Sequence, residues 1–286
     1  MQHPTRNLVL LGRRIILGLA LVSISSMSAQ AQTIVAHRGA SYDAPENTLS
    51  AFRLAWEQNA DGIEGDFYVT KDDHVVCIHD ADTERTGGKK IKVANATLAE
   101  LRSLEYGAWK GSEFAGEPIP TFNEVLKAVP KGKLFVIELK TGPEIVPLIK
   151  DDLVADMKAN SGKEFLFISF QADTVAKCKE LLPSIRAHWL TGFKQDKQSG
   201  AWTPDLKTIC QTIQANQADG VGLKGERAVV DEEFIAQLKR GGCREFHVWT
   251  IDEPADAKYF QKLGAVGITT NRPALIRQSM SASAAK

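Results

Sequence analysis

IVAHRGASYDAPENTLSAFRLAWEQNADGIEGDFYV, residues 34–69, contains the pattern that decides the fold. It begins with a short apolar run, Ile34–His37, continues with an amphipathic segment at Asn47–Gln58, and ends in a second apolar run at Gly62–Val69. Runs this short and continuously apolar are typical of strands covered on both faces, and the segment between them has helical spacing. The stretch therefore predicts a strand-helix-strand unit with parallel strands.

The same alternation continues along the chain. Further strand-like runs occur at Val75–His79, Leu134–Lys140, Phe165–Ser169, Ile185–Leu190, Gly220–Leu223, Phe246–Ile251 and Val266–Thr269. Helical patterns follow at Thr121–Ala128, Pro143–Ala159, Ala172–Leu182, Asp205–Ala215, Asp231–Arg240, Pro254–Leu263 and Pro273–Met280. Helix starts are marked by first-turn prolines and by a capping box that begins at Thr121.

About eight strand-helix units result, with Val75–His79 as an extra strand near the second one. Eight units in roughly 250 residues favour a closed (β/α)8 TIM barrel over an open doubly wound sheet. The lack of a G-x-G-x-x-G motif after the first strand also argues against a dinucleotide-binding sheet. Residues 80–120 are polar, glycine-rich and too long for a simple connection, so they predict a small insertion after the second strand, over one end of the barrel.

The first 31 residues have the pattern of a signal peptide. A basic segment precedes a short apolar run, Ile15–Ile24, and Ala29-Gln30-Ala31 forms a cleavage site. We expect cleavage after Ala31, a mature barrel domain of residues 32–286, and export to the periplasm or the medium. The leader contains three Arg and no acidic residue, so its removal takes the formal net charge from 0 to about −3. Neither nucleic acid nor an anionic membrane surface is indicated as a partner, and no stable membrane anchor is expected.

The four cysteines, Cys77, Cys178, Cys210 and Cys243, are widely spaced and contain no CxxC pair. They therefore form neither a zinc motif nor a redox motif. One or two disulfides in an oxidising compartment and four free thiols both remain open.

Three carboxylates end up near strand ends. Glu64 and Asp66 are two apart on one strand and share a face, and Glu138 occupies the corresponding place on another strand. Buried unpaired carboxylates are costly, and a hard cation such as Ca²⁺ or Mg²⁺ takes oxygen ligands. The alternatives are solvated acids on an edge strand and, for Glu138, an ion pair at the strand end.

Cationic and aromatic residues lie at the same strand ends. His37 and His79 each close an apolar strand, and histidine suits proton transfer near neutral pH. Arg38 and Lys140 can bind an anionic group. Trp249 either fills the core, the commoner fate of such a residue, or forms the wall of a substrate pocket. The remaining candidates, His74, His188 and His247, are interpreted as structural or surface residues. Together the selected groups suit phosphoryl transfer in a barrel whose active site lies at the carboxyl ends of its strands.

The ordered motifs resemble those of the glycerophosphodiester phosphodiesterase family. They are His37-Arg38-Gly39, Pro45-Glu46-Asn47-Thr48, Gly62-Ile63-Glu64-Gly65-Asp66, His79-Asp80, Glu138-Leu139-Lys140 and Trp249-Thr250, and they extend over essentially the whole mature chain. The resemblance implies a TIM barrel that hydrolyses glycerophosphodiesters to sn-glycerol 3-phosphate and an alcohol. The mechanism proposed for such enzymes begins with attack of the glycerol 2-hydroxyl on phosphorus, and water then opens the resulting cyclic phosphate.

The resemblance also implies residue roles. His37 and His79 match the acid-base pair; Glu64, Asp66 and Glu138 match the ligands of Ca²⁺ or Mg²⁺, with Glu46 near that metal shell. Arg38 and Lys140 match the phosphate contacts. Position 271 is Asn where the family commonly has Asp, and since either can cap a helix we expect little effect.

Two other functions are compatible with such a barrel. One is a phospholipase similar to sphingomyelinase D, which releases a cyclic product and needs an apolar lipid-docking surface; the polar insertion offers no obvious one. The other is a non-catalytic periplasmic binding protein, which would be expected to have lost a histidine or a metal ligand. We expect a small-molecule glycerophosphodiester substrate. The head group of that substrate and the oligomeric state of the protein are left open.

Overall fold

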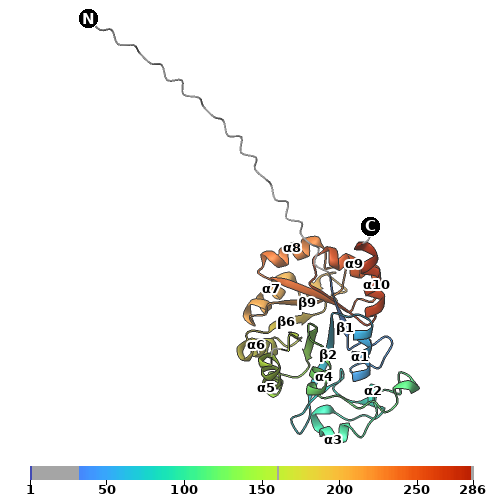
Figure 1. The fold of residues 1–286 in the computed structure, drawn as a ribbon. Helices are drawn as coiled ribbons and strands as arrows, with labels where there is room; N and C mark the ends of the chain where they lie inside the picture. Colours follow the sequence, from blue (N-terminus) through green and yellow to red (C-terminus); the bar gives the residue numbers. More distant parts are fainter. Residues whose placement is uncertain (2–31, 160, 285–286) are drawn as a thin grey trace. The chain divides into compact units, whose positions relative to one another are not determined.

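A computed structural model of the protein describes residue 1, residues 32–159 and residues 161–284. The predicted signal peptide and its cleavage site after Ala31 therefore fall outside the described residues, apart from Met1. Residues 32–286 form one compact unit (Figure 1). Among the described residues no helix combines the length and the apolar character needed to cross a membrane.

Eight parallel strands form a closed barrel. They are β1 (Thr33–His37), β2 (Gly62–Val69), β4 (Leu134–Leu139), β5 (Glu164–Ser169), β6 (Arg186–Thr191), β9 (Gly220–Lys224), β10 (Glu245–Trp249) and β11 (Gly267–Thr270). Each pairs with its neighbour in this order, and β1 pairs with both β11 and β2, which closes the sheet. The prediction of a (β/α)8 TIM barrel is confirmed.

A helix follows each barrel strand and covers the outside of the sheet. These helices are α1 (Leu49–Glu57), α4 (Phe122–Ala128), α5 (Ile145–Lys158), α6 (Ala172–Leu181), α7 (Leu206–Ala215), α8 (Glu232–Arg240), α9 (Pro254–Lys262) and α10 (Pro273–Ala284). The capping box is present, because Thr121 accepts from the Glu124 amide and Glu124 bonds back to Thr121. Helix α5 begins two residues after Pro143, since Gly142 first makes a turn closed by the Glu144 carboxylate.

The predicted extra strand is present as β3 (Val75–Cys77), antiparallel to β2. It is shorter than the apolar run Val75–His79, although the Ile78 N–H beyond it still donates to the Asp66 carbonyl oxygen at 2.9 Å. The insertion then contains α2 (Glu84–Gly87), a 3-10 helix η1 (Val93–Asn95), α3 (Leu98–Leu101) and η2 (Ser112–Phe114). It has a small core of its own, formed by Val76, Ile78, Val93, Ala96, Leu101, Tyr106 and Ile119. Figure 1 shows α2 and α3 together at its lower end, beside α4.

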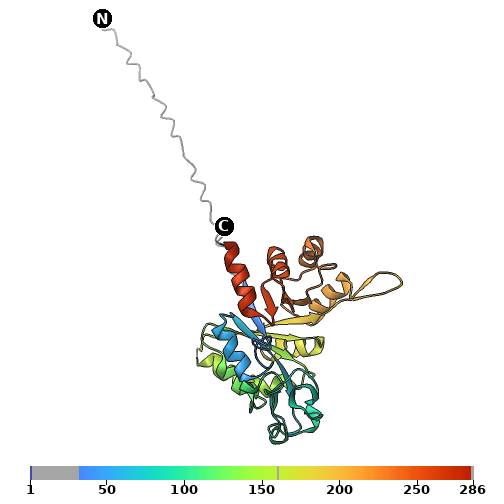
Figure 2. The same ribbon diagram turned by 90° about the vertical axis from the view of Figure 1, so that its right-hand side faces the viewer.

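The structure also has a second, smaller insertion that the sequence did not predict. Between β6 and α7 the chain forms a short hairpin of β7 (Lys194–Gln195) and β8 (Trp202–Thr203), which is the loop projecting on the right of Figure 2. Its strands are two residues long and largely exposed, so they have no apolar pattern that a sequence could display.

Inside the barrel, an apolar layer of Val35, Val136, Leu166, Ile168 and Leu190 supports the polar groups at the strand ends. The four cysteines are free; Cys210 is partly exposed and the other three are buried. The barrel therefore depends on packing rather than on disulfides within the part of the chain that the structure describes.

Candidate active site

Glu64, Asp66 and Glu138 form a buried cluster. Glu64 and Asp66 lie on β2, and Asp66 is the register partner of Glu138 on the adjacent β4. The three residues are 1%, 0% and 8% exposed, and one oxygen from each lies within 4.8 Å of the others. The shared face expected from the two-residue spacing is therefore what brings these carboxylates together.

The cluster fits a divalent cation. Oε1 of Glu64 and Oδ1 of Asp66 are buried and make no hydrogen bond among the described residues, although Oδ1 of Asp66 lies 3.3 Å from the Lys140 ammonium. Burial, and then Asp66 and Glu138, raises the pKa of Glu64 well above its ordinary value. Burial and Asp66 likewise raise the pKa of Glu138 to about 7. Such repulsion between oxygen ligands is what a hard cation relieves, so these residues could hold Ca²⁺ or Mg²⁺.

Arg38 and Lys140 bring positive charge to the cluster. The Arg38 backbone has a positive φ of 55°, and its N–H donates to Glu64 Oε2 at 2.9 Å. Its Nε lies 3.2 Å from Asp66 Oδ2, while Lys140 Nζ lies 2.7 Å from Glu138 Oε1 and 3.3 Å from Asp66 Oδ1. Burial alone would raise the pKa of Asp66, but Lys140 and Arg38 outweigh it and lower that pKa to about 2.

His37 lies at the end of β1, with Nδ1 2.7 Å from Oδ1 of Asn271. Since an amide oxygen only accepts, this contact assigns the proton to Nδ1 and leaves Nε2 unprotonated. Burial and the neighbouring Arg38 lower the pKa of His37 to about 4, so the ring is neutral at pH 7. A neutral imidazole with a free Nε2 can take a proton.

His79 lies just beyond β3 and is about one-third exposed. Its Nδ1 lies 2.7 Å from Oδ1 of Asp80, the next residue in the chain. This contact orients the imidazole, and a ring held in this way can exchange a proton with a bound substrate.

One cavity of about 130 Å³ connects these groups. Its polar side is formed by His37, Arg38, Glu64, His79, Glu138 and Lys140. Its apolar side contains Ile168, Phe170 and Leu190, together with Trp249, which packs edge-on against Phe170 at a centroid distance of 5.4 Å. Of the two alternatives for Trp249, the structure has the ring in the cavity wall.

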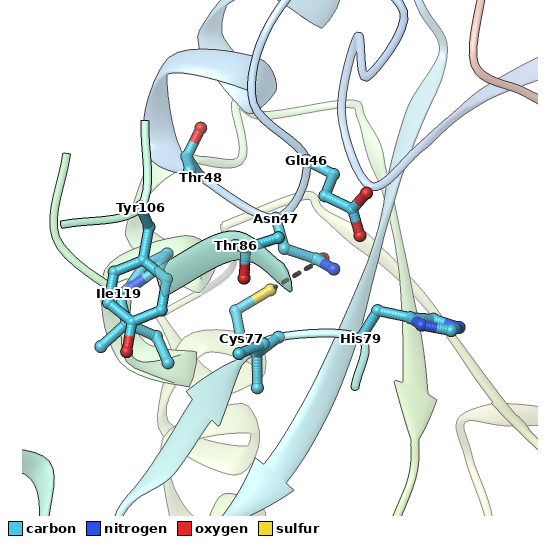
Figure 3. Close-up of a pocket in the computed structure, with 10 residues that line it drawn as sticks. Glu46, Asn47, Thr48, Cys77, His79, Thr86, Tyr106 and Ile119 are labelled. Carbon is cyan, nitrogen blue, oxygen red and sulfur yellow. Dashed lines mark hydrogen bonds between the residues drawn. The ribbon is translucent and has the colours of Figure 1, made fainter. Parts of the chain in front are cut away.

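Asn47 belongs to the candidate site, although the sequence predicted no role for it. Its Nδ2 donates to Asp66 Oδ2 at 2.8 Å, and its Oδ1 accepts from the Asp66 N–H at 3.2 Å. The same Oδ1 accepts from Cys77 Sγ, the dashed bond in Figure 3. The only signal for it was its place in Pro45-Glu46-Asn47-Thr48; the contacts themselves join residues of different strands and turns.

Glu46 is held by two arginines in this structure. Arg38 Nη1 donates to its Oε1 at 2.9 Å, and Arg85 of the insertion donates to both of its oxygens. Glu46 is not part of the three-carboxylate group found among the described residues. Neither Arg85 nor Asn271 was among the candidate site residues, because Glu46 and His37, which they contact, lie on distant segments of the chain.

The model of the "Glycerophosphoryl diester phosphodiesterase family" matches residues 37–275. The chain belongs to this family. Family membership makes it a phosphoric diester hydrolase, as the resemblance implied.

Two curated relatives have names of the same family. A "Glycerophosphodiester phosphodiesterase" of Caldanaerobacter subterraneus is 34% identical over 84% of this chain and 94% of its own length. A Mycobacterium tuberculosis protein named "Probable glycerophosphodiester phosphodiesterase 1" is 52% identical over 84% of this chain and 89% of its own length.

Solved structures share the barrel. An Oleispira antarctica phosphodiesterase, solved with the product sn-glycerol-3-phosphate, is 24% identical with a TM-score of 0.74, covering 88% of this chain and 97% of its own. A glycerophosphodiester phosphodiesterase of Agrobacterium tumefaciens is 24% identical with a TM-score of 0.69, over 86% and 99% of the two chains. At 24% sequence identity, the similarity to these two structures shows that the fold is shared.

Proposed function

We propose that this chain hydrolyses glycerophosphodiesters to sn-glycerol 3-phosphate and an alcohol. The observation that carries the proposal is the single cavity lined by both histidines, by two of the three clustered carboxylates, and by Arg38 and Lys140. Acid-base groups, an oxygen-ligand cluster and two cations are the parts that a phosphodiester reaction needs.

The two histidines transfer the protons of the reaction. His37 Nε2, unprotonated because Asn271 holds the proton at Nδ1, accepts the proton of the glycerol 2-hydroxyl as its oxygen bonds to phosphorus. His79, held by Asp80, donates a proton to the alcohol oxygen as the bond from that oxygen to phosphorus breaks. The two then exchange roles, as His79 takes a proton from the water that opens the cyclic phosphate and His37 returns one to the 2-oxygen.

The charged side chains of the cavity would bind the phosphate group and the divalent cation. Arg38 and Lys140 lie beside the cluster and line the cavity, where their cationic heads can bind the phosphate oxygens. Glu64, Asp66 and Glu138 would hold the divalent cation, Ca²⁺ or Mg²⁺, which would polarise the phosphate when bound.

The test is release of sn-glycerol 3-phosphate from a panel of glycerophosphodiesters by the protein lacking residues 1–31. The reaction is run in EDTA and then with Ca²⁺ or Mg²⁺ added back. Metal-dependent release supports the proposal, and the panel ranks the head groups. If no diester yields product with either metal, the proposal is wrong, and lysophospholipids are then tested for a cyclic product.

We also propose that the chain is exported, on the strength of the signal-peptide pattern in residues 1–31. Expression in a bacterium with two membranes is expected to give a periplasmic protein whose N-terminal residue is Gln32. A protein that stays in the cytoplasm with its leader intact would contradict export.

A further inference from the structure

Two buried histidines stack against each other inside the barrel. The strand between them has glycines at the positions paired with the two histidines. His188 on β6 and His247 on β10 are separated by β9, where they are register partners of Gly220 and Gly222. The rings stack with centroids 5.1 Å apart, and their Nδ1 atoms are 2.9 Å apart. A Cβ at Gly222 would lie 2.5 Å from His247 Nε2, and one at Gly220 would lie 2.8 Å from His188 Nε2. The two glycines therefore make room for the pair.

The partners of His188 determine where its protons lie. Its Nε2 is 2.9 Å from Glu245 Oε1, and Arg186 Nη1 is 3.1 Å from both Glu245 oxygens. The hydrogen bond from His188 lowers the pKa of Glu245, so this carboxylate is ionised and His188 Nε2 donates to it. In the imidazole tautomer that carries its proton on Nε2, the other ring nitrogen of His188, Nδ1, is an acceptor.

The proton between the two rings consequently belongs to His247. His247 Nδ1–H donates to His188, which leaves His247 Nε2 as an acceptor. Burial and His188 lower the pKa of His247 well below its ordinary value, so the ring stays neutral. His247 is 4% exposed and lines the active-site cavity, yet its Nε2 has no hydrogen-bond partner within residues 32–159 and 161–284.

Trp249 has a second buried polar atom without a partner. It lies two residues further along β10, on the same face as His247, and its Nε1–H finds no acceptor in the described chain. Both side chains line the cavity, beside the apolar Ile168 and Leu190. A wall that combines one free acceptor, one free donor and an apolar surface is complementary to a neutral carbon chain with hydroxyl groups.

We propose that His247 and Trp249 bind the hydroxyl groups of the glycerol half of the substrate. His247 Nε2 accepts from one hydroxyl, and Trp249 Nε1–H donates to a hydroxyl oxygen. Glu245 and His188 are positioning residues that keep His247 in the tautomer with a free Nε2. The inference rests on the proposed function and deepens it, since it assigns the glycerol group, rather than the variable alcohol, to the side of the cavity formed by β10.

The test compares binding of two phosphate monoesters to the metal-loaded protein by calorimetry: sn-glycerol 3-phosphate, and n-propyl phosphate, which has the same chain length without hydroxyls. We expect the unsubstituted protein to prefer glycerol 3-phosphate. His247→Phe should weaken glycerol 3-phosphate binding about tenfold, the scale of one buried hydrogen bond, and leave propyl phosphate binding unchanged. His74→Phe, the same change at an exposed site, should alter neither affinity.

The role of His188 is tested in the same assay. His188→Leu removes the acceptor for His247 Nδ1–H and should reduce the preference for glycerol 3-phosphate. His188→Gln has an amide oxygen that can accept the same bond and should retain more of the preference. Equal losses for both ligands in His247→Phe, or equal behaviour of the two His188 variants, would mean that the pair is only structural.

A measurement on the unsubstituted protein avoids any effect on folding. In the nitrogen spectrum of histidine-labelled protein, His247 Nε2 should appear as an unprotonated nitrogen that shifts with glycerol 3-phosphate but not with propyl phosphate. A protonated Nε2, or equal shifts, overturns the inference. Failure of the proposed function looks different, because the protein would then bind neither ester and release no product.

Discussion

Arg85, on the short helix α2 of the insertion, forms a two-point ion pair with Glu46. The distances are 2.7 Å from Nη1 to Oε2 and 2.8 Å from Nη2 to Oε1. The same guanidinium donates from Nε to Asp80 at 2.7 Å, and Asp80 is the partner of His79. Arg85 therefore connects the turn that contains Glu46 with His79, the proposed general acid. Figure 3 shows how closely the insertion approaches this turn, with Thr86 and Tyr106 lining the same pocket as Asn47.

Arg85→Ala is expected to lower kcat/KM by about tenfold to a hundredfold, because Asp80 and His79 lose their support. Arg85 is 44% exposed, so the free energy of unfolding should change by less than about 1 kcal/mol. Arg85→Lys should fall between, since lysine cannot bind Glu46 at two points. The control is Lys90→Ala, which removes an exposed ion pair of the same insertion. Unchanged kcat/KM in Arg85→Ala would contradict the positioning role.

His37→Ala and His79→Ala are each expected to reduce kcat by about 10² to 10⁴. Both histidines line the cavity, and the reaction needs one group to take a proton and another to give one. His74→Ala is the matched control, because His74 lies on the exposed turn before β3, where its side chain pairs with Asp72. Near-normal turnover in either cavity variant, with the fold verified by circular dichroism, would exclude the assigned role.

Asn271→Asp replaces a neutral amide beside His37 with a carboxylate. We expect the pKa of His37 to rise from about 4, because a nearby negative charge stabilises the imidazolium. A base acts only when unprotonated, so the acidic limb of the kcat/KM profile should move to higher pH. The sequence indicates only a helix-capping role for position 271, whereas the contact with His37 predicts that this residue also sets the acidic limb.

Asp252 complicates this substitution. Its oxygens accept from the Asn271 N–H at 2.8 Å and from Nδ2 at 2.6 Å, so Asn271→Asp places two carboxylates together. The matched variant is therefore Asn271→Asp with Asp252→Asn, which exchanges the two groups. If the acidic limb stays in place in both the single and the double variant, Asn271 does not govern the pKa of His37.

Glu64→Gln tests the metal site through stability rather than activity. Added Ca²⁺ or Mg²⁺ should raise Tm of the unsubstituted protein, because an ion that binds only the folded state stabilises it. The variant should lose this response. Without metal it should be at least as stable as the parent, since it removes one of three mutually repelling carboxylates. Glu84→Gln, an exposed acid of the insertion, should keep the full response; a full response in Glu64→Gln would contradict the assignment.

The same cluster predicts a pH dependence. The pKa of Glu138 in the folded protein is raised from its ordinary value of 4.5 to about 7. Between these values the metal-free folded state holds a proton that the unfolded state has lost, so this group's contribution makes stability fall as pH rises across that window. Metal must displace that proton, and the rise in Tm on adding metal should therefore be smaller at pH 6 than at pH 8. Melting curves at the two pH values, with and without metal, check both signs.

Gly222→Ala is expected to destabilise the barrel by about 1–3 kcal/mol, measured by urea unfolding. A Cβ there would lie 2.4 Å from a Leu190 methyl and 2.5 Å from the His247 ring. Gly192→Ala is the control, because the nearest atom to a Cβ at that position is 3.9 Å away. Similar stability of the two variants would show that the histidine pair can move aside.

Much of the site was accessible from local pattern. Glu64 and Asp66 share a face because a strand repeats every two residues, and that rule needs no tertiary information. His37 and His79 were found because polar residues closing apolar strands meet at one end of a barrel. Asn271, Arg85 and the pair of His188 and His247 were not found, because each partner lies on another element.

The order of strands and helices, the closed parallel barrel and the polar ends of its strands could all be predicted from the amino-acid sequence. These follow from hydrophobic periodicity and helix capping, which act over a few residues. Which polar groups touch depends instead on the folded barrel. Asn271 reaches His37 across 234 residues because β1 pairs with β11, and His188 reaches His247 because β9 has glycines between them. Such contacts depend on register and on the space left by small residues, which only the closed barrel defines.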